Sequence, residues 1–317
     1  MKPITAFAPF KLSSPAFYNW CKRVAKKGTA ATEVISNFMA RDPASQSWGS
    51  LGILEAFEGS GPVHDLDGAG YLIMYQLNQR ILPGAVRDEK LRDRIASLVE
   101  KEDRDPTKQE YAQLRDQVES ELLPLAFIRR THIPVLVFKE RILICCPSAK
   151  RHEDICYHLG QMLAAREVDC AITLTWTMDD IKPLLMKTAL GDAMYATSDR
   201  HFEAADAAVF KGSDKRSMRI KDRDVSHSEV QQVLVKGSYE VTELRLNYKT
   251  EDGEDILLCN LTDKLVVKGI KLAQTTELKS AEDAHATMYL FARELHSLTE
   301  DIISALGGDA AHEDDEL

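Results

Sequence analysis

Hydrophobic and polar positions alternate in several short runs, and this period of two predicts β-strands. The N-terminal candidates are residues 4–12 (ITAFAPFKL), 48–58 (WGSLGILEAFE) and 70–77 (GYLIMYQL). Further candidates are 133–138, 141–146 and 168–176, and then 239–248 (YEVTELRLNY), 255–261 and 264–272. A turn at 251–253 (EDG) joins two of these runs.

Apolar residues at helical spacing predict helices between the strands. Residues 85–101 place Leu91, Ile95, Leu98 and Val99 on one face, and a second helix from Lys108 carries apolar positions through Leu122 and Leu123. Together these two helices predict a largely solvent-facing hairpin. Other helices are expected at 16–27, 148–166, from 179 onward, at 226–236 and at 281–306.

The order of elements indicates the fold class. Strands and helices do not alternate as βαβ units, so the sequence predicts an α+β fold with antiparallel sheets, flanking helices and a projecting helical hairpin. At 317 residues the chain has room for about two domains.

Composition restricts the setting of the protein. No run approaches a membrane span and the N-terminus lacks a signal-peptide pattern, so a cytoplasmic protein is expected. The six cysteines form no CxxC pair and are expected to be reduced thiols. The net charge of −10, taken alone, argues against a nucleic-acid partner, so the distribution of charge decides.

The most basic window is 209–224 (VFKGSDKRSMRIKDRD), interpreted as a flexible loop interrupted by Asp222. Its cations suit contacts with phosphates, and a solvated loop is the alternative. Three weaker groups of cations lie elsewhere in the chain. One of them lies on the predicted helix at 85–101, and its acidic neighbours would make it an ordinary salt-bridged surface. The candidate DNA-binding residues are Lys215, Arg216, Arg219, Lys221, Arg223, Arg129, Arg130, Lys150, Arg151, Arg87, Lys90 and Arg94.

Sites for metals or catalysis are poorly supported by the sequence. His152, Cys156 and His158 are close together but lie on an amphipathic helix, so no metal or cofactor is expected. A metal-dependent nuclease would need converging carboxylates. Asp65 and Asp67 belong to a turn-like loop and Asp179 and Asp180 to a helix start, so no catalytic residue is assigned.

Several motifs in a fixed order resemble the bacterial RdgC family. They are RILPGAVRDEKLRDRIASL, LLPLAFIRR, CPSAKRHEDICYHL, SHSEVQQVLVKGSYEVTELRL and a terminal helix that ends in ALGG. The resemblance covers residues 80–308 and is weaker before residue 70. It predicts a central α+β domain at 1–82 and 132–200, a hairpin at 83–131, a base domain at 201–308 and an acidic disordered tail at 309–317.

The resemblance also implies a function. Family members are nucleoid-associated proteins that bind double-stranded DNA with little sequence preference and restrain the RecA recombinase. They form ring-shaped homodimers of elongated subunits, with no catalytic activity. The gate between subunits carries over to Phe127, with Leu123 and Pro124 beside it, whereas the residues alone also allow Phe127 to pack in the core. Arg129 and Arg130 would then lie near the inner rim.

One further alternative follows from the acidic charge. The chain would regulate a recombinase as a protein-interaction module without touching DNA. Charge reversal in the basic window distinguishes the two functions, because only a DNA-binding protein would lose DNA affinity.

Overall fold

The computed structural model describes residues 3–195, 200–212, 216–223, 239–273 and 281–310, together with positions 225, 227, 230 and 232. Two compact units divide the chain. Unit 1 comprises Met1–Ala31, Glu55–Ile73 and Pro134–Leu317, and unit 2 comprises Thr32–Leu54 and Met74–Ile133. Long strands pass from one unit into the other, because β4 (Tyr71–Ile81) and β5 (Phe127–Val137) each contain residues of both.

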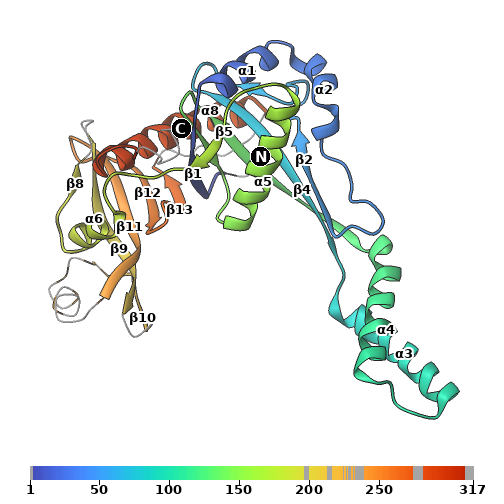
Figure 1. Cartoon of the computed structure of the whole chain (residues 1–317). Helices are drawn as coiled ribbons and strands as arrows, with labels where there is room; N and C mark the ends of the chain where they lie inside the picture. Colours follow the sequence, from blue (N-terminus) through green and yellow to red (C-terminus); the bar gives the residue numbers. More distant parts are fainter. Residues whose placement is uncertain are drawn as a thin grey trace. The chain divides into compact units, whose positions relative to one another are not determined.

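Unit 1 is built on antiparallel strands in the order β10-β9-β11-β12-β13-β1-β6-β5 (Figure 1). Their bounds are β1 Ala6–Leu12, β6 Arg141–Ile144, β9 Arg200–Gly212, β10 Ser217–Lys221, β11 Tyr239–Thr250, β12 Asp255–Thr262 and β13 Val267–Leu272. Three short strands pair off this path, namely β3 His64–Asp65, β7 Ile172–Leu174 and β8 Met194–Tyr195. The antiparallel pairing confirms the predicted α+β class.

Helices complete unit 1. They are α1 Ala16–Ala25, α5 Ala149–Ala165, α6 Ile181–Ala189 and α8 Ala281–Ala305. The long α8 is fixed to two strands by polar contacts, because Tyr248 of β11 hydrogen-bonds to Asp301 and the buried Arg141 of β6 pairs with Glu300. Burial alternates along β11, where Leu244, Leu246 and Tyr248 are fully buried. One face of this part of the sheet therefore forms the core.

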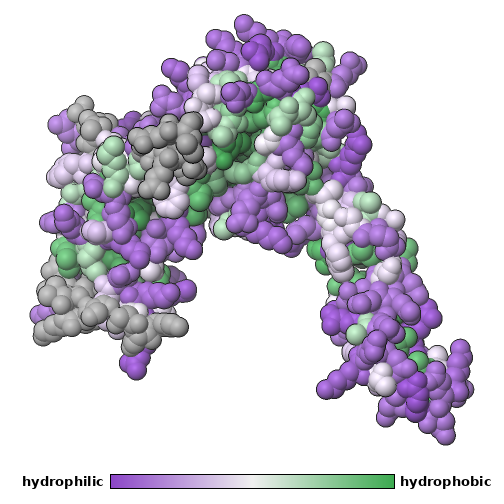
Figure 2. All heavy atoms as spheres, in the orientation of Figure 1, coloured by the Kyte–Doolittle hydropathy of each residue, from purple (hydrophilic) through white to green (hydrophobic). Residues whose placement is uncertain are grey.

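Unit 2 contains a helical hairpin between two strands. β2 (Gly49–Leu54) pairs with β4, and α3 (Gly84–Glu102) and α4 (Lys108–Leu122) connect β4 to β5. Asp103 ends α3 in the left-handed region, with φ 50°, and a capping box from Thr107 to Glu110 begins α4. The hairpin has a largely hydrophilic surface (Figure 2), as its sequence predicted.

Three sequence expectations need correction. A 3₁₀ helix, Leu123–Leu125, follows α4, so Leu123 does not continue that helix. β5 begins at Phe127, six residues before the predicted strand start. The basic window is no flexible loop in its described part, because residues 209–212 and 217–221 belong to β9 and β10.

Several predictions fall on residues outside this description. The expected helix at 226–236 lies mostly there, and so does the acidic tail from residue 311 onward. Each remaining predicted strand and helix has a counterpart within a few residues, but α2 (Ala31–Val34), β3, β8 and the long strand β9 were not predicted. Over the described part of the chain, no helix combines the length and apolar character needed to cross a membrane.

Candidate nucleic-acid interface and subunit contact

The basic window forms an edge hairpin of the sheet. β10 pairs with β9 in antiparallel register, with Arg219 opposite Val209 and Lys221 opposite Ala207. Arg219 and Lys221 are exposed, and Ile220 between them is half-buried. Because successive side chains of a strand project to opposite faces, the two cations share one face, and so does Lys211 opposite Ser217. We define Lys211, Arg219 and Lys221 as the basic edge.

Ion pairs distinguish the basic edge from the strands beside it. Among the described residues, no carboxylate lies within ion-pair distance of Lys211, Arg219 or Lys221. On the neighbouring β11 strand, by contrast, Arg245 Nη1 lies 3.0 Å from Asp206 Oδ1 and Lys249 Nζ lies 2.7 Å from Glu203 Oε2. The Lys249 hydrogen bond is the main cause of a lowered pKa of Glu203. The positive charges of the basic edge are therefore not neutralised, whereas those of the neighbouring β11 strand are balanced by carboxylates.

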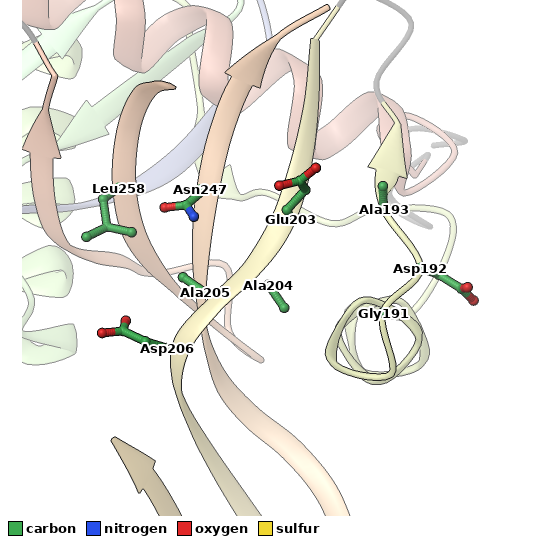
Figure 3. Close-up of a pocket in the computed structure, with 9 residues that line it drawn as sticks. All are labelled: Gly191, Asp192, Ala193, Glu203, Ala204, Ala205, Asp206, Asn247 and Leu258. Carbon is green, nitrogen blue, oxygen red and sulfur yellow. The ribbon is translucent and has the colours of Figure 1, made fainter. Parts of the chain in front are cut away.

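A shallow hollow of about 660 Å³ lies on β9 beside the balanced charges. In Figure 3, Ala204 and Ala205 lie on β9 between Glu203 and Asp206, and Asn247 lies on the adjacent strand. Small side chains leave this hollow open, and two of its three carboxylates, Glu203 and Asp206, are those paired with Lys249 and Arg245. It therefore adds no positive charge to the interface.

The other residues of the basic window flank β10. Arg216 is exposed immediately before the strand, and its carbonyl accepts a hydrogen bond from the Gly212 N–H at 2.8 Å. Arg223 is exposed after it. Asp222 ends the strand in the left-handed region, with φ 56°, so it serves the chain reversal there. Lys215 lies outside the described residues.

Arg129 and Arg130 lie on the exposed half of β5. Arg129 Nη2 donates to Gln79 Oε1 at 3.2 Å, and Arg130 Nη2 pairs with Asp42 Oδ1 at 3.0 Å. Adjacent strand residues point to opposite faces, so one surface presents only one of these two arginines. Arg130 is balanced by its carboxylate, whereas Arg129 has a neutral amide partner.

The cations of α3 are paired across the helical hairpin. Arg87 Nη1 lies 3.2 Å from Glu119, and Glu121 accepts both Lys90 at 2.8 Å and Arg94 at 2.9 Å. The Lys90 hydrogen bond is the main cause of the lowered pKa of Glu121. The salt-bridged alternative therefore describes these residues. Their main partners belong to α4, and Asp88, beside Arg87, is the partner from α3 itself.

Lys150 and Arg151 occupy the first turn of α5. Lys150 is exposed and Arg151 is half-buried. The positive charge of Arg151 lowers the pKa of the Cys146 thiol, but burial is the larger effect and the pKa is raised overall. Cations at a helix N-terminus gain nothing from the helix dipole, so their position is not explained by helix stability.

The predicted subunit contact is a short turn held rigidly from within unit 2. Arg80 donates to the carbonyls of Leu123 and Pro124 at 3.0 and 3.1 Å, and to that of Pro43 at 3.1 Å. This network satisfies carbonyl groups that the end of α4 leaves open. The turn is therefore fixed before any partner binds.

Exposure divides the apolar residues of this turn. Phe127 is 83% exposed, so the alternative of core packing does not hold within one chain. Leu125 is 79% exposed and is a candidate that sequence analysis missed. Leu123 is only 4% exposed and belongs to the core of unit 2, which corrects its expected place on a contact surface. The signal for Leu125 was its position directly after Pro124, a residue that interrupts the helical pattern.

Two of the carboxylates and one of the histidines considered for other chemistry have local structural roles. Asp65 Oδ1 accepts the Gly68 N–H at 3.2 Å within a turn, and Asp180 caps α6 by accepting the Lys182 N–H at 3.1 Å. His152 is buried and its Nε2 lies 2.7 Å from the Cys146 carbonyl. Within the described residues, no three His, Cys, Asp or Glu side chains are grouped to hold a metal ion.

Comparison with known proteins agrees with the motif resemblance. A family model with the description "Putative exonuclease, RdgC" matches residues 15–309. The recombination-associated protein RdgC of Shewanella baltica (strain OS195) is 29% identical over 307 residues, which cover 92% of this chain and 95% of that protein. The protein of the same name from Pseudomonas putida is 26% identical over 271 residues, 84% of each chain. The chain therefore belongs to the RdgC family.

Proposed function

We propose that this protein is a non-catalytic, sequence-nonspecific double-stranded DNA-binding protein that acts in homologous recombination. The observation that carries the proposal is the basic edge, where Lys211, Arg219 and Lys221 have no carboxylate partner among the described residues. Cations of this kind bind phosphates by releasing counterions, which requires no base-reading geometry. Arg216, Arg223, Arg129, Lys150 and Arg151 are the secondary candidates, and association with the nucleoid would follow.

The paired cations contribute less to this proposal. Arg87, Lys90 and Arg94 already have carboxylate partners, and so does Arg130. A phosphate would have to displace those partners, so much of the Coulombic gain would be lost. The net charge of −10 also repels DNA from most of the surface, which favours contact at the basic edge.

We further propose a ring-shaped homodimer that encircles DNA, with Leu125 and Phe127 at the gate. Two large apolar side chains held on a fixed turn are suited to bury against a partner, because exposed aromatic anchors carry a large share of interface energy. Their preformed turn lowers the entropic cost of association. The role in recombination rests on the names of the relatives, and restraint of a RecA-type recombinase rests on the family resemblance.

DNA binding is tested with a fluorescent duplex over a salt series. We expect similar affinity for unrelated sequences and a steep fall with salt. Arg219→Glu with Lys221→Glu should abolish binding, whereas the matched control Lys26→Glu with Lys27→Glu reverses two exposed cations outside the basic window and should bind nearly as well. Equal losses in both variants would mean that only overall charge matters.

The same duplex assay, combined with a recombinase assay, distinguishes a DNA-binding protein from a protein-interaction module. If the wild-type protein fails to bind duplex DNA at low salt yet inhibits strand exchange by a RecA-type recombinase, the interaction-module alternative is correct. If Arg219→Glu with Lys221→Glu removes both DNA binding and inhibition, the DNA-binding function accounts for the effect.

The ring is tested by comparing circular with linear DNA. A closed ring slides from linear ends but is retained on a circle, so retention on a plasmid should exceed retention on the same plasmid after linearisation. Phe127→Ser should lower the dimer fraction in sedimentation and abolish this difference. Tyr157→Ser is the control, because Tyr157 is an exposed aromatic residue on α5. If Phe127→Ser leaves retention on the plasmid unchanged, the assignment of Phe127 to the gate is wrong.

The family description makes exonuclease activity the second candidate. Two of the four carboxylates that suggested it, Asp65 and Asp180, are engaged in a turn and a helix cap, and this supports a non-catalytic protein. Incubation of labelled linear duplex with purified protein and Mg²⁺ or Mn²⁺ tests the point. Digestion that co-purifies with the protein and is lost in Asp65→Asn or Asp179→Asn would establish the nuclease instead.

A further inference from the structure

A row of exposed apolar side chains begins at the last residue of β7 and continues into the segment after that strand. It lies outside the proposed DNA and gate surfaces. Leu174 is 57% exposed, Trp176 is 56% exposed and Met178 is 69% exposed, and Thr175 between the first two is buried. This alternation is that of an extended segment with one face open. We call Leu174, Trp176 and Met178 the apolar row. Contiguous exposed apolar surface of this kind marks interaction sites.

Backbone bonds fix the row in place. β7 pairs with β1, opposing Leu174 to Phe10. Farther along, the Ala310 N–H donates to the Trp176 carbonyl and the Met178 N–H donates to the Gly308 carbonyl, both at 3.0 Å. The segment is therefore held on the body of unit 1 by strand pairing and by the chain that follows α8, so its side chains are presented in a fixed arrangement.

A cavity of about 600 Å³ adjoins the row. Leu174 and Trp176 form part of its lining, with Phe10 and Ile181 among the other apolar side chains. Thr175 also lines it, is only 8% exposed, and its Oγ1 has no hydrogen-bond partner among the described residues. An unpaired buried hydroxyl is costly, so a bound polar group that pairs with it would be stabilised there.

The charge around the cavity indicates its occupant. Asp179, Asp180 and Asp263 line it against a single ammonium, that of Lys264, among the described residues. Such a surface repels DNA and attracts cations. It therefore complements a partner that combines positive charge with an apolar anchor.

We propose that the apolar row and its cavity bind a cationic peptide segment of a partner protein, inserting an aromatic or aliphatic side chain beside Trp176 while its lysines or arginines face Asp179 and Asp263. Thr175 Oγ1 supplies a hydrogen bond to the bound segment. This site does not depend on DNA binding, since none of its residues belongs to the basic edge or to the gate.

Binding is tested by fluorescence anisotropy with a fluorescein-labelled dodecapeptide in which phenylalanines alternate with lysines. Matched peptides replace every lysine by glutamate or every phenylalanine by serine. We expect the first peptide to bind and the other two to bind at least about 10-fold more weakly, since anchors and charge act together. Equal binding of the serine peptide would reduce the effect to bulk charge and overturn the proposal.

Variants locate the site on the protein. Trp176→Ala should weaken the peptide by about 10-fold or more, as loss of an anchor does. Trp48→Ala is the matched control, because Trp48 is 51% exposed and lies in unit 2. Asp179→Asn with Asp263→Asn should weaken binding and flatten its salt dependence.

Other occupants give distinct results. If Trp176→Ala leaves peptide binding unchanged but lowers self-association in sedimentation, the row is a contact between copies of this chain and the proposal falls. If Trp176→Ala lowers duplex binding as strongly as Arg219→Glu with Lys221→Glu does, the row belongs to the DNA surface and the proposal falls as well. Unchanged duplex binding, with lost peptide binding, supports it.

Discussion

Leu123 and Leu125 lie two positions apart in one 3₁₀ helix, and only the first is buried, at 4% against 79% exposure. Arg80 holds the carbonyl of Leu123 and that of Pro124, so the backbone here is fixed and each side chain has one environment. The same short apolar motif therefore supplies the core of unit 2 with one leucine and the surface with the next.

Truncation of the two leucines should separate stability from assembly. Leu123→Ala should lower the free energy of unfolding by about 2–4 kcal/mol, because it removes buried methyl groups and leaves a cavity. Leu125→Ala should change it by less than about 0.5 kcal/mol, as for an exposed site. Urea denaturation of both variants checks this, and sedimentation should detect weaker self-association for Leu125→Ala. Equal destabilisation would contradict the assigned environments.

Neutralising paired and unpaired cations should affect DNA binding unequally. Arg219→Gln with Lys221→Gln should reduce the slope of log affinity against log salt by about 2, one for each lost phosphate contact. Lys90→Gln with Arg94→Gln removes the same charge but should leave that slope nearly unchanged, because Glu121 already holds both cations. The duplex titration decides, and an equal change in slope would place α3 at the DNA as well.

The contact between Arg141 and Glu300 should contribute to the stability of unit 1. Arg141 is 2% exposed, and it also lies 3.3 Å from Asp309. Glu300→Gln should lower the free energy of unfolding by about 1–3 kcal/mol, since a buried cation loses a charged hydrogen-bond partner. Glu89→Gln on the exposed face of α3 is the control. Thermal or urea unfolding measures the stability of both variants. Equal losses in Glu300→Gln and Glu89→Gln would mean that Asp309 alone is a sufficient partner for Arg141.

Acidification should destabilise unit 1 in part through His152. Burial is the main cause of its lowered pKa, so the folded state binds a proton only below the ordinary value of 6.5. As pH falls through 6.5, the unfolded state binds more protons than the folded state, and stability decreases. Above 6.5 this contribution is fully present. The pKa values of His64 and His158 are lowered as well and act in the same direction.

The His152 contribution is measured by urea midpoints at several pH values. His152→Gln retains a hydrogen-bond donor for the Cys146 carbonyl but does not titrate in this range. We expect its stability to fall less steeply than that of the wild type between about pH 7.5 and 5.5. His132→Gln is the control, because it makes the same substitution at an exposed histidine on β5. Parallel curves for the wild type and His152→Gln would refute the assignment.

The sequence by itself determined the local elements whose signals lie close together along the chain. The stripe containing Leu91, the helix start at Lys108 and the turn at 251–253 each depend on neighbours within a few residues, and the structure places α3, α4 and the β11–β12 pair accordingly. The motif order also identified the family. The strand β10 was not predicted from the sequence, because the many charges of this window, Arg219 and Lys221 among them, obscured the alternation with Met218 and Ile220.

Only the tertiary structure decided which of these residues are available to a partner. Glu121 neutralises Lys90 and Arg94 from another helix, Leu125 is exposed while Leu123 is buried, and Trp176 adjoins a cavity that also includes Phe10 and Ile181. Each outcome depends on contacts between segments far apart in sequence. Such contacts carry no local periodicity, so the hydrophobic pattern predicts the helix or strand and leaves its surroundings undetermined.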